Sequence, residues 1–200
     1  MRRKLSSFLI GLGVLMIFGA AGLLLHNRQE SEQAASISAR ILPEISAYVE
    51  AARETATLPP LMTDPAAQPR QMTVASIDGH DYIGVLSIPA IGYESQVLAE
   101  WSYPLLELGA CRFHGSVYSD DLVLCAHNYQ QLFRRVTQLQ PGDEVLFTDM
   151  DGLTWTYEVA DLETLQPDMV EEMNDSGYDF TFFTCTYGGQ SRLTLRCVRN

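Results

Sequence analysis

The stretch Phe180-Thr-Phe-Phe-Thr-Cys-Thr-Tyr-Gly-Gly-Gln-Ser-Arg-Leu-Thr-Leu-Arg-Cys-Val-Arg199 predicts two β-strands joined by a tight turn. Cys185 ends the first apolar run, and Arg192 opens the second. The glycines at 188 and 189 supply the backbone freedom that a tight turn needs. The second strand therefore returns beside the first and places Arg192 close to Cys185.

The alternation of the second strand separates its two faces. Leu193 and Leu195 point to one face, whereas Arg192 and Arg196 point to the other. The apolar face belongs on the core, so both arginines lie on the polar face. Arg196 lies two pleats further along, roughly 6–7 Å at about 3.3 Å per residue. We therefore expect Arg192, and not Arg196, to act together with the thiol of Cys185.

A second apolar run, Leu122–Ala126, ends in His127. A thiol, an imidazole and a guanidinium at three strand ends are the parts of a thiol acyl-transfer site. The thiolate attacks a carbonyl, the imidazole moves protons and the guanidinium holds the developing oxyanion. Each residue also has an ordinary structural role as its alternative: a core thiol for Cys185, a core histidine for His127 and a surface ion pair for Arg192.

The chain around these runs predicts a mainly β domain, because short strands alternate with turn signals in the pattern of an antiparallel sandwich or barrel. Helical spacing over Asn128–Leu139 predicts a short helix that braces His127. The predicted strands are Tyr82–Ile88, Ser95–Leu98, Leu122–Ala126, Asp143–Thr148, Thr154–Ala160, Phe180–Thr184 and Arg192–Val198.

Four of these segments resemble the motifs of sortases, in the order in which that family carries them. Thr181–Cys185 resembles the signature Thr-Leu-x-Thr-Cys, with Phe in place of Leu, and Ala126–Asn128 is similar to Gly-His-Asn. Arg192–Arg196 resembles the last strand that supplies the essential arginine, and Ile83–Gly92 resembles the strand that opens the domain. The resemblance spans about Tyr82–Arg199.

The resemblance implies a membrane-anchored cysteine transpeptidase of bacterial, mostly Gram-positive, surfaces. Sortases cut a sorting peptide after its threonine and join that threonine to an amine. The implied fold is mainly β, a closed sortase-type barrel with short helices, preceded by a transmembrane helix. The implied catalytic residues are Cys185, His127 and Arg192, with no cofactor. His-Asn resembles class B members, whereas the short turn before Arg192 and the following Arg196 resemble pilin-type and class D members.

The N-terminal part predicts a signal anchor. Met1-Arg-Arg-Lys4 precedes an uncharged apolar run of 18 residues, Phe8–Leu25, which is long enough to span a membrane. A cleaved signal peptide is the alternative, but Leu23–Leu25 carries the apolar run past the small residues of a cleavage site. Basic residues before the helix predict a cytoplasmic N-terminus and an extracellular catalytic domain in a single-pass protein of the cell membrane.

We expect three regions: residues 1–26 as cytoplasmic tip and anchor, 27–71 as helical stalk and linker, and 72–200 as the catalytic domain. Helical spacing from Asn27 to about Leu58 is compatible with a free stalk or with a helix that packs on the domain. The four prolines of Leu58–Pro69 predict a semi-rigid spacer, with a lid over the active site as the alternative.

The net charge of the chain limits the classes of partner that it can bind. All 25 acidic residues follow the apolar run, against ten of the 13 basic ones, so the remainder of the chain carries a net charge of −15. Such a surface repels nucleic acid. The expected partners are secreted proteins with a C-terminal sorting motif, an amine acceptor on a peptidoglycan precursor or a pilin, and the membrane.

The spacing of cysteines and histidines tests for metal sites, for disulfides and for other classes of cysteine enzyme. Cys111, Cys125 and Cys197 are expected to be free thiols, with a disulfide between two of them as the alternative. No pair has the Cys-x-x-Cys spacing of a zinc site, so we expect no metal. An L,D-transpeptidase carries His two residues before Cys, whereas 58 positions separate His127 from Cys185. A papain-like peptidase has Cys before His. A catalytically inactive, membrane-tethered peptide-binding domain is the non-enzymatic alternative.

Overall fold

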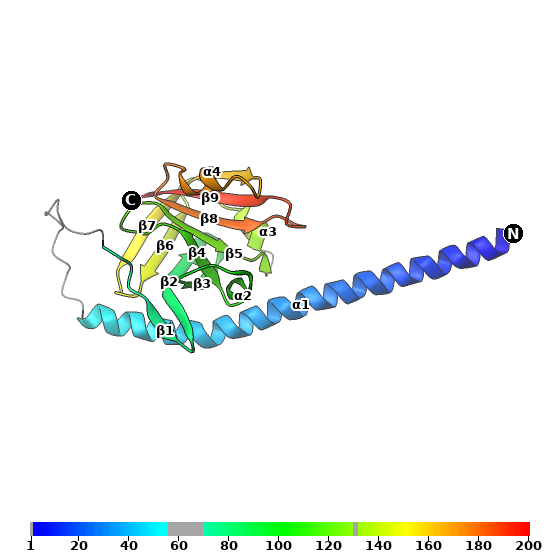
Figure 1. Ribbon diagram of the computed structural model, residues 1–200, viewed down its shortest axis with the longest axis horizontal. Coiled ribbons are helices and arrows are strands. Elements are labelled where there is room, and N and C mark those ends of the chain that lie inside the picture. Colours follow the sequence, from blue (N-terminus) through cyan, green and yellow to red (C-terminus); the bar gives the residue numbers. More distant parts are fainter. Residues whose placement is uncertain (1, 56–69, 130–131) are drawn as a thin grey trace.

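The computed structural model of the chain describes residues 2–55, 70–129 and 132–200, and shows a β-barrel beside one long helix (Figure 1). The elements are α1 (Arg2–Thr55), β1 (Ala75–Ile77), β2 (His80–Ile88), a 3-10 helix (Pro89–Ile91), β3 (Tyr93–Leu98), α2 (Tyr103–Leu106), β4 (Ala110–His114), β5 (Leu122–Ala126), α3 (Leu132–Val136), β6 (Glu144–Asp149), β7 (Thr154–Leu165), α4 (Val170–Asn174), β8 (Phe180–Cys185) and β9 (Arg192–Arg199).

The strands of the described chain close on themselves. They follow the order β2-β3-β4-β5-β8-β9-β7-β6, and β6 pairs again with β2, while β1 pairs with the first residues of β2. Most neighbours are antiparallel, but β3–β4 and β5–β8 are parallel. The mainly β, closed-barrel fold with short helices is thereby confirmed. Closure leaves few unpaired strand edges, which limits edge-to-edge association with other chains.

Strand alternation sorts side chains between the barrel interior and its outer face. On β9, Leu193, Leu195 and Cys197 are buried in the interior core, so the predicted apolar face is confirmed. On β5, Leu124 points inward, whereas Cys125 belongs to a second apolar cluster on the outer face. His127 and Cys185 continue the outward-facing sets of β5 and β8.

The second half of α1 packs on the barrel, which decides between the two alternatives for this helix. Ile41, Ile45 and Val49, at helical spacing, are buried against the outer faces of β2 and β3. The helix runs through Pro43. An ion pair between Arg40 and Asp78, 2.9 Å long, adds a polar contact to this interface.

The first half of α1 projects away from the barrel (Figure 1). Its apolar side chains from Ile10 to Leu25 are exposed, and this part of the helix is long and apolar enough to cross a membrane. It fits a membrane anchor. The Pro-rich segment Leu58–Pro69, with its predicted spacer or lid, lies outside the described residues.

Candidate active site

The three predicted catalytic residues lie at one end of three neighbouring strands. Ala126 of β5 is level with Thr184 of β8, and Cys185 is level with Arg192 of β9. His127, Cys185 and Arg192 therefore form a row across the strands, on the outer face of the barrel. Adjacent strands lie about 4.8 Å apart, so Cys185 has His127 on the strand to one side and Arg192 on the strand to the other.

Side-chain hydrogen bonds fix the strand ends that carry the thiol and the imidazole. The Thr184 hydroxyl donates to the Ala126 carbonyl at 3.0 Å, which ties β8 to β5 one residue before Cys185 and His127. The Asn128 side chain accepts from the Phe133 backbone N–H at 2.7 Å and links the residue after His127 to α3. The predicted brace beside His127 is present, although α3 is shorter than the predicted helix.

The turn between β8 and β9 positions the arginine. The Thr186 backbone N–H donates to the Ser191 carbonyl at 3.0 Å and closes the turn. Gly188 and Gly189 have φ values of 81° and 71°, a left-handed conformation that other residues adopt only with strain. The Nη1 atom of Arg192 donates to the Gly189 and Ser191 carbonyls at 3.0 and 3.2 Å, so the guanidinium rests on this turn.

A groove of about 350 Å³ runs past the row, and all three candidate residues line it. Aromatic rings form part of its wall, with Phe183 against Phe113 and Phe113 against Trp101 at centroid distances of 5.2 and 5.5 Å. Met169, Val170 and Met173, in and just before α4, line it as well. The groove is apolar, with the thiol, imidazole and guanidinium as its reactive polar groups, which suits an extended peptide with apolar side chains.

The cysteines differ in exposure in the way that a single nucleophile requires. Cys185 is partly exposed, whereas Cys111, Cys125 and Cys197 are buried. All four are free thiols, which agrees with the prediction for Cys111, Cys125 and Cys197. Burial raises the pKa of Cys111 to about 12 and raises the pKa values of Cys125 and Cys197 further. These three thiols therefore form little nucleophilic thiolate at neutral pH.

Burial lowers the pKa of His127 below its ordinary value of 6.5, and the carboxylates of Glu107 and Glu30 oppose this shift only in part. The imidazole is mainly neutral at pH 7. Asp120 and Asp121 stand before β5, at the end opposite His127. Asp120 pairs with Arg199, and Asp121 pairs with His114 at 3.8 Å, so neither aspartate is placed to accept a hydrogen bond from His127.

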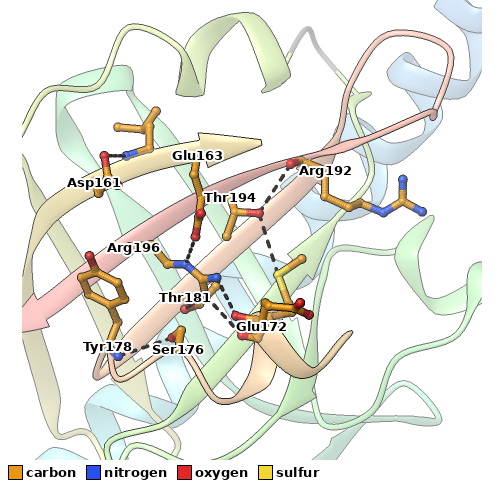
Figure 2. Close-up of polar contacts among 11 residues, drawn as sticks. Asp161, Glu163, Glu172, Ser176, Tyr178, Thr181, Arg192, Thr194 and Arg196 are labelled. Atoms are coloured by element: carbon orange, nitrogen blue, oxygen red, sulfur yellow. Dashed lines mark hydrogen bonds and ion pairs between the residues drawn. The ribbon is translucent and has the colours of Figure 1, made fainter. Parts of the chain in front are cut away.

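Arg196 has a different role from Arg192, and its burial was not evident from the sequence. Its side chain is 2% exposed and donates to Glu163 at 2.7 Å, to the Thr181 hydroxyl at 2.9 Å, and to the carbonyls of Glu172 and Met173 at 2.7 and 3.2 Å. Figure 2 shows this cluster, with the Arg192 guanidinium pointing away from it. Arg196 thus ties α4, a wall of the groove, to β7 and β8.

Comparison with known proteins identifies the family. A family model described as a sortase domain matches residues 86–200, more than half of the chain. The chain belongs to the sortase family. No curated protein matches it. The sequence-based assignment to the sortases is therefore confirmed.

Solved sortase structures resemble the barrel. Sortase C1 of Streptococcus suis is 28% identical over 60% of this chain and 74% of its own, with a TM-score of 0.51. Sortase C1 of Streptococcus agalactiae is 25% identical over 60% of this chain and 69% of its own, with a TM-score of 0.52. A Clostridium perfringens sortase D5 transpeptidase covers 82% of this chain and 99% of its own at 19% identity and a TM-score of 0.60, a likeness of fold.

The described part of this sortase contains no group of three His, Cys, Asp or Glu side chains that could hold a metal ion. The absence of a cofactor from the reaction stays a prediction.

Proposed function

We propose that this chain is a sortase transpeptidase that cleaves the C-terminal sorting motif of secreted proteins and transfers the acyl group to an amine of the cell wall or of a pilin. The observation that carries the proposal is the row of Cys185, His127 and Arg192 on adjacent strand ends, all lining one groove. Membership of the sortase family supports the class of reaction, and the row supports the choice of catalytic residues.

The acylation step follows from the groups in the row. Cys185 passes its proton to His127, and the thiolate attacks the carbonyl of the sorting-motif threonine. Arg192 stabilises the oxyanion, since it pairs in register with Cys185 across β8 and β9 and lines the same groove. The imidazolium of His127 then protonates the leaving amine, the C–N bond breaks, and a Cys185 thioester remains.

Deacylation uses the same groups in the reverse order. Neutral His127 accepts a proton from the incoming amine, whose nitrogen attacks the thioester carbonyl. The C–S bond breaks, and Cys185 leaves as a thiolate. The lowered pKa of His127 favours this step, because the base is already unprotonated at neutral pH.

The regions of the chain fit an enzyme of the cell surface. Residues 1–26 act as the cytoplasmic tip and membrane anchor, 27–71 connect it to the barrel, and 72–200 carry the catalysis. The basic residues Arg2, Arg3 and Lys4 keep the N-terminus on the cytoplasmic side, so the barrel faces outward.

The test is product identification with the full chain in detergent. Synthetic peptides covering the C-terminal sorting regions of secreted proteins from the same source are incubated with and without an added amine, and products are resolved by mass spectrometry. The proposal predicts a threonyl amide with the amine and a threonine acid without it. Acid alone in both reactions would mark a cysteine peptidase, and binding without cleavage would mark an inactive peptide-binding domain.

A further inference from the structure

His127 also lines a second cavity, separate from the groove that contains Cys185 and Arg192, which is here called the peptide groove. The volume of the second cavity is about 120 Å³, and neither Cys185 nor Arg192 lines it. It lies between α1, β3 and the chain that follows α2, and it shares Leu106, Ala126 and His127 with the groove. The imidazole is therefore accessible from two cavities, of which only one holds the nucleophile.

This cavity continues along α1. A third cavity of about 300 Å³ shares Ala34, Glu107 and Tyr129 with the second one and extends to Glu30 and His26. His26 follows the apolar run Phe8–Leu25 directly. The two cavities adjoin at these shared residues, and together, here called the helix-side channel, they extend from His26 to His127.

The helix-side channel has a negative charge balance. Glu30, Glu94 and Glu107 line it, and Glu30 pairs with His26 at 3.2 Å. Arg135 is the opposing charge, and its guanidinium donates to the carbonyls of Ile91 and Gly92. Glu107 and Glu30 act on the His127 ring itself, since both carboxylates oppose the effect of burial on its pKa.

Hydrogen bonds hold the wall of the channel in place. Gln96 is completely buried, accepts from the Ser38 hydroxyl at 2.9 Å and donates to the Leu108 carbonyl. These bonds join α1, β3 and the chain after α2 around the second cavity. A volume of about 120 Å³ accommodates several water-sized groups, which is enough for an ammonium group and the methylenes next to it.

We propose that the helix-side channel binds the primary ammonium group of the acceptor and delivers it to His127, with Glu107 as its main recognition residue. This inference rests on the proposed transpeptidase function and adds the site of its second substrate. The bound ammonium loses one proton to water, and the nitrogen forms a C–N bond to the thioester carbonyl. A second proton passes to His127, and the C–S bond breaks to release the Cys185 thiolate.

The assignment explains why two cavities meet at one imidazole. His127 protonates the amine that leaves through the peptide groove and deprotonates the amine that arrives through the channel. Glu107 is exposed and lines both the second and the third cavity, whereas His127 lines only the second, so a cation that arrives through the third cavity meets Glu107 before His127. A carboxylate there raises the local concentration of cations relative to neutral nucleophiles.

The test separates recognition of the amine from acylation. The full chain in detergent is acylated at Cys185 with an N-acetyl-threonine thioester, desalted, and followed by intact mass spectrometry as the adduct is lost. The rate of loss is measured against the concentration of n-butylamine, a cation at pH 7.5, and of hydroxylamine, which is uncharged there. The slope of each plot is the aminolysis constant, and the ratio of the two slopes measures selection for positive charge.

We expect Glu107→Gln to lower the n-butylamine slope about two- to fivefold, the range of a partly exposed ion pair, and Glu107→Lys to lower it at least about tenfold. The ratio of the n-butylamine slope to the hydroxylamine slope falls with it. Glu144→Gln, an exposed position on β6 outside the channel, is the control with the same change in net charge and leaves the ratio at the wild-type value.

Three outcomes would overturn the proposal. One is an n-butylamine slope for Glu107→Lys equal to that of the wild type. Another is an equal loss for both nucleophiles, which would indicate general damage in place of charge recognition. Failure of Cys185 to take up the acyl group would overturn the proposed function and the acceptor site together.

Discussion

Replacement of Arg192 and replacement of Arg196, both on β9, should affect different properties of the protein, because the two side chains have different partners. Arg196 is buried and donates to Glu163, Thr181 and two carbonyls of α4 (Figure 2). Arg192 donates to carbonyls of an exposed turn. The perturbation is a single Ala substitution at each position.

The magnitudes follow from these contacts. Arg196→Ala leaves a partly buried carboxylate and several acceptors without their donor, which costs about 3–5 kcal/mol of unfolding free energy. For a chain of this size that loss lowers Tm by roughly 6–20 °C. Arg192→Ala costs at most about 1 kcal/mol in stability. It removes the oxyanion donor, however, and should lower kcat by about 10²–10³.

The assay combines tryptophan fluorescence with kinetics on the same preparations. Trp101 and Trp155 are the only tryptophans and both belong to the barrel, so thermal unfolding followed by their emission reports on the barrel and not on the anchor. Arg192→Lys should restore little activity, because an ammonium lacks the planar fork of a guanidinium. Arg196→Ala should keep a kcat closer to the wild type at temperatures where it is folded.

Equal losses of kcat at both positions would refute the geometric argument. A Tm for Arg196→Ala within 2 °C of the wild type would refute the structural role of the buried cluster. An essential Arg196 beside a dispensable Arg192 would mean that the register of β9 against β8 is wrong.

Three further predictions test other parts of the site. Ala substitution of each buried cysteine should cost about 1–2 kcal/mol in stability and retain activity, and loss of acyl-enzyme formation in one of them would contradict the choice of nucleophile. Hydrolysis of the acyl-enzyme should fall as pH drops through the pKa of His127, so at pH 6.5 the rate should still exceed half its plateau, and a midpoint at or above 6.5 would disagree with the burial of the ring. Deletion of residues 1–26 should give a soluble, folded and active protein, whereas Ile45→Asp should lower its Tm strongly, because Ile45 is completely buried under the barrel; equal Tm values with and without Ile45→Asp would show that α1 does not dock.

The strands that carry the site were predictable because their alternation is strong. β5 has the predicted bounds, and β8 and β9 each extend one residue beyond them. The predicted strand from Thr154 was too short, since β7 continues to Leu165 through a register shift after Val159, where the alternation breaks. The alternation of apolar and polar residues no longer predicts a strand beyond such a bulge, although the backbone pairing continues.

Elements that depend on distant partners were missed. β4 (Ala110–His114) contains an arginine and a histidine and is held by two-residue parallel pairing to β3 and by antiparallel pairing to β5. β1 is three residues long. Neither has a local pattern that would distinguish it from a loop.

Within the site, the positions of Cys185, His127 and Arg192 could be inferred from motif and alternation, but their surroundings could not. The alternation of β9 places Arg192 and Arg196 on a polar face, opposite the core. Thr194 and Arg196 on that face are buried, because α4 covers it, and the sequence pattern does not indicate this cover. The helix-side channel likewise depends on where α1 docks, which the sequence left open between a free stalk and a packed helix.

The most direct measurement of the central claim is the mapping of the covalent intermediate. The full chain and its Cys185→Ala variant are incubated with a sorting peptide, quenched in acid, digested and analysed by mass spectrometry. The threonyl acyl group should be found on the peptide containing Cys185 in the wild type, be absent from the variant and disappear on addition of an amine. An acyl group on another residue, or peptide cleavage by Cys185→Ala at the wild-type rate, would contradict the assignment of Cys185 as the nucleophile.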